Sequence, residues 1–190
     1  MIIIGITGTI GAGKGTIVDY MVEKHGFKHL SVRQFLIDII NERGLTPNRD
    51  SMVLVANELR ANHEPSYITD RLYDKALESG QNCIIESIRT PGEVISLRKK
   101  ENFYLFAVDA DSQKRYERII IRNSETDNIS FETFLANEER EMKSENPNHQ
   151  NLSKCIQMAN YVFSNNKTIE DLQNEIEPIL VEINNKITKA

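Results

Sequence analysis

The chain has 190 residues, of which 39% are hydrophobic and 27% are charged, and its formal net charge is −5 at pH 7. This length accommodates one well-buried core and is short for two, so we expect a single domain over residues 1–190. The acidic balance argues against a general nucleic-acid-binding surface, and no apolar run reaches the ~18 residues of a membrane span. An acidic protein that binds phosphates must gather its positive charge at one place.

The cysteine content and the first residues favour a cytoplasmic protein. Cys83 and Cys155 lie far apart in the sequence and match no metal-ligand spacing, so we expect two buried thiols in a reducing compartment. The N-terminal sequence MIIIGIT has the pattern of a strand rather than that of a basic leader.

Short β-branched runs alternate with longer helical patterns, which predicts a parallel sheet covered by helices on both faces. The expected strands cover residues 2–7, 27–31, 82–87, 103–109 and 161–164. The expected helices cover residues 14–24, 32–42, 51–61, 66–79, 92–101 and 112–122. A last helix begins near Thr168, and Pro178 should end or kink it. The predicted fold class is α/β, with three α/β/α layers around a five-stranded parallel sheet.

Two segments interrupt this alternation. Residues 44–65 insert an extra helix between the second and third strands, and residues 123–150 are polar and acidic without a predicted strand. Each segment is either a solvated helical excursion or a moving piece over a site, which would be an acceptor-binding insertion and a lid-like segment, respectively.

The sequence GTIGAGKGT at residues 8–16 follows the first strand and opens the first helix. Its glycines let backbone N–H groups point inward, the helix N-terminus adds positive charge, and Lys14 can reach terminal phosphates. This context predicts a Walker A phosphate-binding loop and a P-loop NTPase fold. The usual hydroxyl after the lysine, which ligates Mg²⁺, is replaced by Gly15. Thr16 should therefore contact phosphate, and the metal should be held mainly by phosphates, water and a remote carboxylate.

The spacing G-x-x-G-x-G-K-G-T resembles adenylate kinase and its nucleoside monophosphate kinase relatives. Those kinases end the strand that matches the third strand with Asp-Gly-Phe-Pro-Arg, where this chain has ESIRT at residues 86–90. The resemblance implies ATP and Mg²⁺, with Glu86 as the carboxylate beside the metal and Arg89 on the acceptor phosphate. YERIIIR places Arg118 and Arg122 on one helix face, and the same kinases carry two phosphate-contacting arginines there.

These observations define the candidate site residues. The catalytic candidates are Lys14, Glu86, Arg89, Arg118 and Arg122. The nucleotide-binding candidates are Gly11, Ala12, Gly13, Lys14, Gly15, Thr16 and Arg118. The metal-site candidates are Thr16 and Glu86.

The acceptor side is less defined. The lid-like segment offers Arg140, which either serves the site or forms an ion pair with a neighbouring glutamate. The arginine expected after the second strand is Leu36 here, and Arg33 or Arg60 could replace it or be a surface charge.

The expected activity is transfer of the γ-phosphoryl group of ATP to a ribo- or deoxyribonucleoside monophosphate, a small-molecule partner. The start IIGITGTIGAGK and the tail MANYVFSNNKTIEDLQNEI resemble dephospho-CoA kinase, which is the first alternative. The second is a nucleotide-binding regulatory or accessory module, which the acidic lid-like segment and Glu86 favour. A signalling GTPase is disfavoured because the sequence lacks Asn-Lys-x-Asp and has Gly15 after the lysine.

Overall fold

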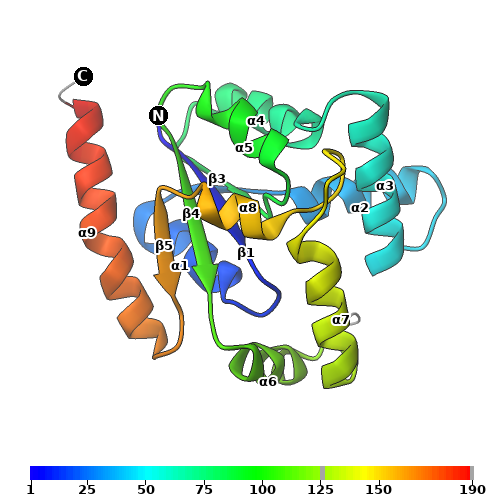
Figure 1. Ribbon diagram of the computed structural model, residues 1–190. Coiled ribbons are helices and arrows are strands. Elements are labelled where there is room, and N and C mark those ends of the chain that lie inside the picture. The colour runs from blue at the N-terminus through cyan, green and yellow to red at the C-terminus, as the bar shows by residue number, and fades with distance from the viewer. Residues whose placement is uncertain (125–126, 189–190) are drawn as a thin grey trace.

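The computed structural model describes residues 1–124 and 127–188, and its centre is one five-stranded sheet in the order β2-β3-β1-β4-β5 (Figure 1). Each neighbouring pair of strands is parallel, so all carboxyl ends lie at the same edge. The strands are β1 (Ile3–Gly8), β2 (Lys28–Ser31), β3 (Cys83–Glu86), β4 (Phe103–Asp109) and β5 (Tyr161–Ser164). The predicted parallel sheet is confirmed.

Helices cover both faces of the sheet, which confirms the three-layer α/β class. One face packs against α1 (Lys14–His25) and α9 (Ile169–Thr188). The other packs against α2 (Val32–Glu42), α3 (Arg49–Asn62), α4 (Tyr67–Ser79), α5 (Pro91–Arg98) and α8 (Leu152–Gln157). Figure 1 shows α6 (Ser112–Arg122) and α7 (Phe131–Met142) beyond the carboxyl ends of the strands.

The sheet has one hydrophobic core on each face, because successive side chains of a strand point to opposite faces. Ile4 and Ile6 of β1 face α1 and α9, whereas Ile3 faces the larger set of helices. Parallel strands buried on both faces have no polar face, which explains their nearly continuous apolar sequences. Cys83 and Cys155 are both buried and free, as expected, and belong to the larger core.

Apart from shifted bounds, the structure departs from the expected elements at Pro178 and at α8. Of the two outcomes expected at Pro178, an end or a kink, the end is wrong, because α9 continues through this residue to Thr188. Burial of Ile176, Leu180 and Ile183 against the sheet offsets the missing N–H donor of the proline. The short helix α8 has no counterpart among the expected helices, and α7 lies within the lid-like segment, of which residues 125–126 are outside the described residues.

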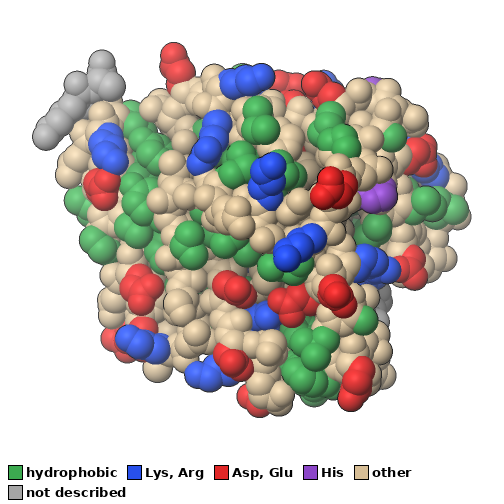
Figure 2. Space-filling model, in the orientation of Figure 1, with side chains coloured by type: hydrophobic (Ala, Val, Ile, Leu, Met, Phe, Trp, Pro, Cys, Tyr) green, Lys and Arg blue, Asp and Glu red, His purple; other side chains and the backbone are tan. Residues whose placement is uncertain are grey.

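The surface carries mixed charge. On the face drawn in Figure 2, acidic and basic side chains are interspersed rather than gathered by sign. Among the helices formed by residues 1–124 and 127–188, none combines the length and the apolarity needed to cross a membrane.

Candidate functional site

The glycine-rich loop connects β1 to α1 at the carboxyl edge of the sheet. Gly8, Gly11 and Gly13 have φ values of 146°, 74° and 102°, a region that residues with a Cβ atom rarely adopt. Contacts add a second constraint, because a Cβ atom on Gly13 would lie 2.2 Å from Nδ2 of Asn165. A Cβ atom on Gly15, by contrast, would meet nothing within 4 Å. The loop is therefore held in one shape, while the start of α1 at Gly15 is open.

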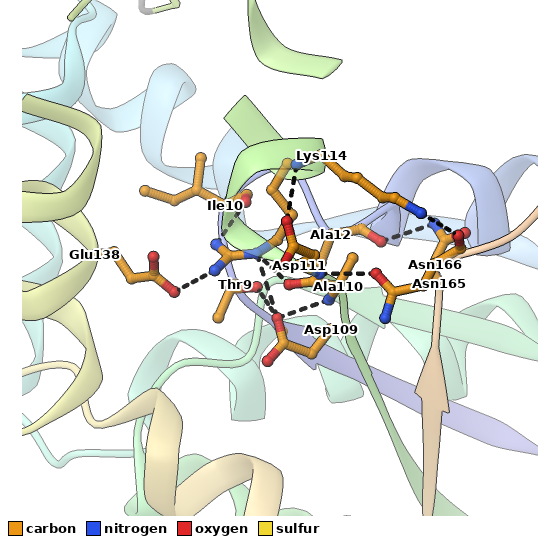
Figure 3. Close-up of polar contacts among 12 residues, drawn as sticks. Thr9, Ile10, Ala12, Asp109, Ala110, Asp111, Lys114, Glu138, Asn165 and Asn166 are labelled. Atoms are coloured by element: carbon orange, nitrogen blue, oxygen red, sulfur yellow. Dashed lines mark hydrogen bonds and ion pairs between the residues drawn. The ribbon is translucent and has the colours of Figure 1, made fainter. Parts of the chain in front are cut away.

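Side chains from β4, α6 and the segment after β5 hold this loop from behind (Figure 3). Nδ2 of Asn165 donates to the carbonyl of Ala12 at 2.8 Å, and Oγ1 of Thr9 donates to Asp109 at 2.5 Å. The buried guanidinium of Arg115 donates to the carbonyl of Ile10 at 3.2 Å and to that of Ala110 at 2.7 Å. The bonds to Ala12 and Ile10 satisfy carbonyl groups of the loop, so these carbonyls point away from the side on which a ligand would meet loop N–H groups. The N–H of Ala12 itself donates to the carbonyl of Thr9 at 3.3 Å.

Lys14 is folded onto the same loop. Its Nζ donates to the carbonyls of Gly8 and Thr9 at 3.0 and 2.8 Å. Burial, together with the positive charge of Arg89, lowers the pKa of Lys14 to about 8. A polyphosphate beside this amine would favour its charged form.

Glu86 ends β3 beside the loop, because β3 pairs with β1 in a register that places Glu86 opposite Ile6. Its carboxylate contacts Nε2 of His29 at 3.2 Å. Burial alone would raise the pKa of Glu86, but the hydrogen bond from His29 and the charge of Lys14 outweigh it, and the pKa is lowered. Glu86 is thus an ionised carboxylate next to the phosphate-binding loop.

The segment after β3 is strained and firmly tied. Ser87 has a φ of 71°, which is unfavourable for a residue with a side chain, at the point where the chain turns toward Arg89. The carboxylate of Glu93 accepts hydrogen bonds from the backbone N–H groups of Arg89 and Thr90 at 2.8 and 3.0 Å. The buried guanidinium of Arg60 pairs with Glu93 at 2.9 Å. Arg60 therefore supports the segment that carries Arg89.

The side chain of Arg89 meets a carboxylate from the lid-like segment. Its Nη1 donates to Glu141 at 2.6 Å and to Oε1 of Gln150 at 2.9 Å. Arg49, at the start of α3, forms an ion pair with the other oxygen of Glu141. Burial alone would raise the pKa of Glu141, but Arg89 and Arg49 outweigh it, so the pKa is lowered and the group is ionised.

The two arginines of α6 lie in different environments. Arg122 forms a two-pronged pair with Asp127, with both N···O distances at 2.7 Å. Arg118 turns to the other side and donates through Nη2 to the carbonyl of Asn165 at 2.9 Å. Its Nη1 is buried and has no hydrogen-bond partner within residues 1–124 and 127–188.

The glycine-rich loop, the segment after β3, the start of α3 and the lid-like segment surround one cavity of about 400 Å³ at the carboxyl edge of the sheet. Five of the predicted site residues line it: Gly11, Lys14, Glu86, Arg89 and Arg122. The predicted residues Ala12, Gly13, Gly15, Thr16 and Arg118 are not part of this described lining. Ala12, Gly13, Gly15 and Thr16 lie in the loop and the first turn of α1, and Arg118 lies beside Asn165.

Several acidic residues of the lid-like segment form ion pairs with arginines of other segments. Asp127 pairs with Arg122, Glu138 pairs with Arg115 at 2.7 Å, and Glu141 pairs with Arg49 and Arg89. Arg140, the basic candidate of this segment, is exposed and donates to Oδ1 of Asn137 at 3.4 Å, and it forms no ion pair among the described residues.

Four residues that shape the site were not among the candidates: Arg49, Arg115, Glu141 and Asn165. Arg49 and Glu141 lie 92 positions apart in the sequence, and no local pattern pairs them. The segment NNKT, which contains Asn165, belongs to the tail that resembles dephospho-CoA kinase, and no contact with the glycine-rich loop was predicted for it. Its position directly after the last strand was the available signal, because loops at that edge of a parallel sheet face the same crevice.

Comparisons with known proteins agree with this architecture. A UPF0200 protein of Methanocaldococcus jannaschii is 29% identical over 197 aligned residues, which cover 100% of this chain and 94% of that protein. The crystal structure of TT1252 from Thermus thermophilus is 21% identical, with a TM-score of 0.62 and coverage of 95% of this chain and 97% of that chain.

Shikimate kinase from Bacteroides thetaiotaomicron is 13% identical, with a TM-score of 0.61 and coverage of 94% of this chain and 98% of that chain. These structural likenesses show a shared P-loop kinase fold. Residues 4–145 match the protein family described as AAA domain, which is about three quarters of the chain. The chain belongs to this family.

Proposed function

We propose that this protein is an ATP-dependent phosphotransferase that moves the γ-phosphoryl group to a nucleoside monophosphate. The observation that carries the proposal is the convergence of Lys14, Glu86, Arg89 and Arg122 on one cavity beside the glycine-rich loop. Phosphoryl transfer needs positioning and positive charge around the transferring group, and little covalent help from the protein. This cavity concentrates arginines and a lysine in a protein of net charge −5.

The donor nucleotide would bind along the loop. The inward N–H groups and the start of α1 would hold its β- and γ-phosphates, with Lys14 turning from the loop carbonyls to the γ-phosphate. Arg118 suits the same side, because its Nη1 is buried next to the loop and unpaired among the described residues. Adenine as the base is implied only by the resemblance to adenylate kinase.

The residues present fit a magnesium ion that is held mainly by the phosphates and water, with few ligands from the protein. No group of three or more His, Cys, Asp or Glu residues that could hold a metal occurs in the described part of the chain. Glu86 is ionised and lines the cavity with Lys14, so it would bind the ion directly or through water, and Thr16 is the second candidate. The ion would supply positive charge that neutralises the phosphates during transfer.

The acceptor would occupy the opposite end of the cavity, which is lined by Val32, Leu36 and Met52 together with Arg49 and Arg89. An oxygen of the acceptor phosphate attacks the γ-phosphorus, the bond to the β–γ bridging oxygen breaks, and ADP leaves. The presence of α3 residues in this lining supports the assignment of residues 44–65 as an acceptor-binding insertion. The pairing of Asp127, Glu138 and Glu141 with arginines supports residues 123–150 as a lid-like part of a single domain. We place the enzyme in the cytoplasm because Cys83 and Cys155 are both free, as is usual in a reducing compartment.

A second candidate is a nucleotide-binding accessory module without a small-molecule acceptor. The contact that favours it is the pairing of Arg49 and Arg89 with Glu141, because the arginines expected on an acceptor phosphate already hold a carboxylate of the chain.

The test measures γ-phosphoryl transfer from labelled ATP or GTP, with Mg²⁺, to all ribo- and deoxyribonucleoside monophosphates and to dephospho-CoA. Lys14→Ala is the blank, and Lys24→Ala, at the exposed end of α1, is the matched control. One monophosphate well above the others would support the proposal. Transfer to dephospho-CoA alone would make dephospho-CoA the acceptor instead of a nucleoside monophosphate. Tight ATP binding without transfer to any acceptor would favour the accessory module.

A further inference from the structure

The strongest unexplained feature of the cavity is the buried carboxylate of Glu141. Its side chain is 4% exposed, although it belongs to an otherwise largely exposed helix, α7. One oxygen contacts Nη1 of Arg89 at 2.6 Å and the other pairs with Arg49. Burial of a charged group is favourable only where it is paired, and here two guanidinium groups from distant segments provide the pairing.

The two guanidinium groups form an oxyanion site. Arg49 comes from the first turn of α3, and Arg89 comes from the segment that Glu93 and Arg60 fix in place. Guanidinium groups bind carboxylates and phosphates with the same planar donor geometry. An acceptor phosphate that takes the same donors, Nη1 of Arg89 and Nη2 of Arg49, displaces Glu141 from them.

We propose that Glu141 determines acceptor specificity by competing internally for Arg49 and Arg89, so that a phosphate monoester dianion can enter and a singly charged carboxylate cannot. The inference rests on the proposed function, because it concerns the acceptor end of the same cavity. A tethered carboxylate acts at a high effective concentration, so a second carboxylate gains nothing by replacing it. A phosphate monoester brings nearly twice the charge and three acceptor oxygens, which allows it to win the exchange.

Displacement of Glu141 from the two arginines also loosens the end of α7. Glu141 lies in the last turn of α7, which ends at Met142, and its ion pairs join this turn to α3 and to the segment after β3. Entry of the phosphate releases that turn while the pair between Glu138 and Arg115 keeps the middle of α7 on the loop side.

The experiment compares two probes that differ in the anionic group only, phenyl phosphate and benzoate. Titration calorimetry measures their affinities for the protein saturated with ADP, so that the glycine-rich loop is occupied in every sample. The variants are Glu141→Gln and, as a matched control on an exposed position of the same helix, Glu139→Gln. The wild type and Glu139→Gln should bind phenyl phosphate and show no measurable affinity for benzoate.

In Glu141→Gln we expect the affinity for phenyl phosphate to rise about tenfold or more and binding of benzoate to become measurable. Adding Arg49→Gln to this variant should remove the gain. An unchanged or weaker affinity for phenyl phosphate in folded Glu141→Gln would overturn the proposal, and so would equal binding of both probes by the wild type.

A measurement on the wild type covers the case in which Glu141→Gln does not fold. Hydrogen exchange at the last turn of α7 should become faster when phenyl phosphate is added and stay unchanged with benzoate at equal ionic strength. Unchanged or slower exchange with phenyl phosphate would overturn the proposal. Because these measurements involve no phosphoryl transfer, their failure leaves the proposed kinase activity standing. Failure of the transfer assay, in turn, does not alter them.

Discussion

The two ends of the cavity, to which we assign the donor and the acceptor, are built in opposite ways. At the donor end, backbone groups of residues 8–16 form the binding surface, and side chains such as Arg115 and Asn165 hold the loop from behind. At the acceptor end, side chains form the binding surface, and Arg49 and Arg89 converge on Glu141 from segments far apart in the sequence. A backbone surface tolerates many anions of one geometry, whereas a side-chain surface can be specialised by a single substitution.

The largest expected effect tests the donor end. Lys14→Ala should lower the rate of phosphoryl transfer by roughly 10³-fold or more, because a positioned charge on the transferring phosphate is lost. Steady-state kinetics measures the rate, and circular dichroism should show an intact fold. Lys24→Ala serves as the control for loss of a lysine from α1. Transfer by Lys14→Ala at close to the wild-type rate would contradict the assignment of the loop.

The second prediction distinguishes the acceptor end of the cavity from the donor end. Arg89→Ala should raise the acceptor KM or lower kcat by about 100-fold in all, and change ATP affinity much less, because its contacts lie with Glu141 and Gln150. Kinetics with each substrate varied in turn measures the split. Arg71→Ala, an exposed arginine of α4, is the control. Equal loss for both substrates would move Arg89 to the donor end.

The third effect concerns stability and the fixed shape of the loop. Gly13→Ala should lower the free energy of unfolding by about 2 kcal/mol or more, because it combines a φ of 102° with a contact of 2.2 Å to Asn165. Gly15→Ala should raise it by up to about 1 kcal/mol, since the new methyl group meets nothing and glycine weakens a helix. Urea denaturation measures both. Equal effects of the two substitutions would show that the loop is not held as described.

The smallest effect is a pH dependence of nucleotide binding. With a pKa of about 8, Lys14 is mostly charged at pH 7 and mostly neutral at pH 9, so ADP affinity should fall severalfold over this range. Arg89 and Arg122 favour the neutral form of Lys14, while Glu86 and Glu141 favour the charged form. Calorimetry should also show proton uptake on binding above pH 8. In Lys14→Arg, which stays charged, the fall should disappear, and its persistence there would exclude Lys14 as its source.

Much of the fold could be predicted because its signals are local. Apolar runs such as IIIGIT and FYLFAVD predict buried parallel strands, which the pairing of β1 with β4 and the burial of nearly every residue in both strands confirm. Pro178 does not end α9, because the cost of one missing hydrogen bond is smaller than the gain from burying the apolar face of this helix. Propensity at one residue was outweighed by packing over the whole helix.

The sequence by itself determined the parallel α/β fold and the glycine-rich loop, since a strand, three glycines and a helix start lie within a few consecutive residues. The resemblance to adenylate kinase also indicated Glu86 and Arg89, since ESIRT at residues 86–90 matches the strand ending Asp-Gly-Phe-Pro-Arg of those kinases. Only the tertiary structure decided that Arg49 pairs with Glu141, that Arg60 supports Glu93, and that the acidic segment faces arginines. An ion pair depends on the distance between two side chains in space. When the partners lie many residues apart in the chain, no repeating pattern in the sequence indicates that they meet.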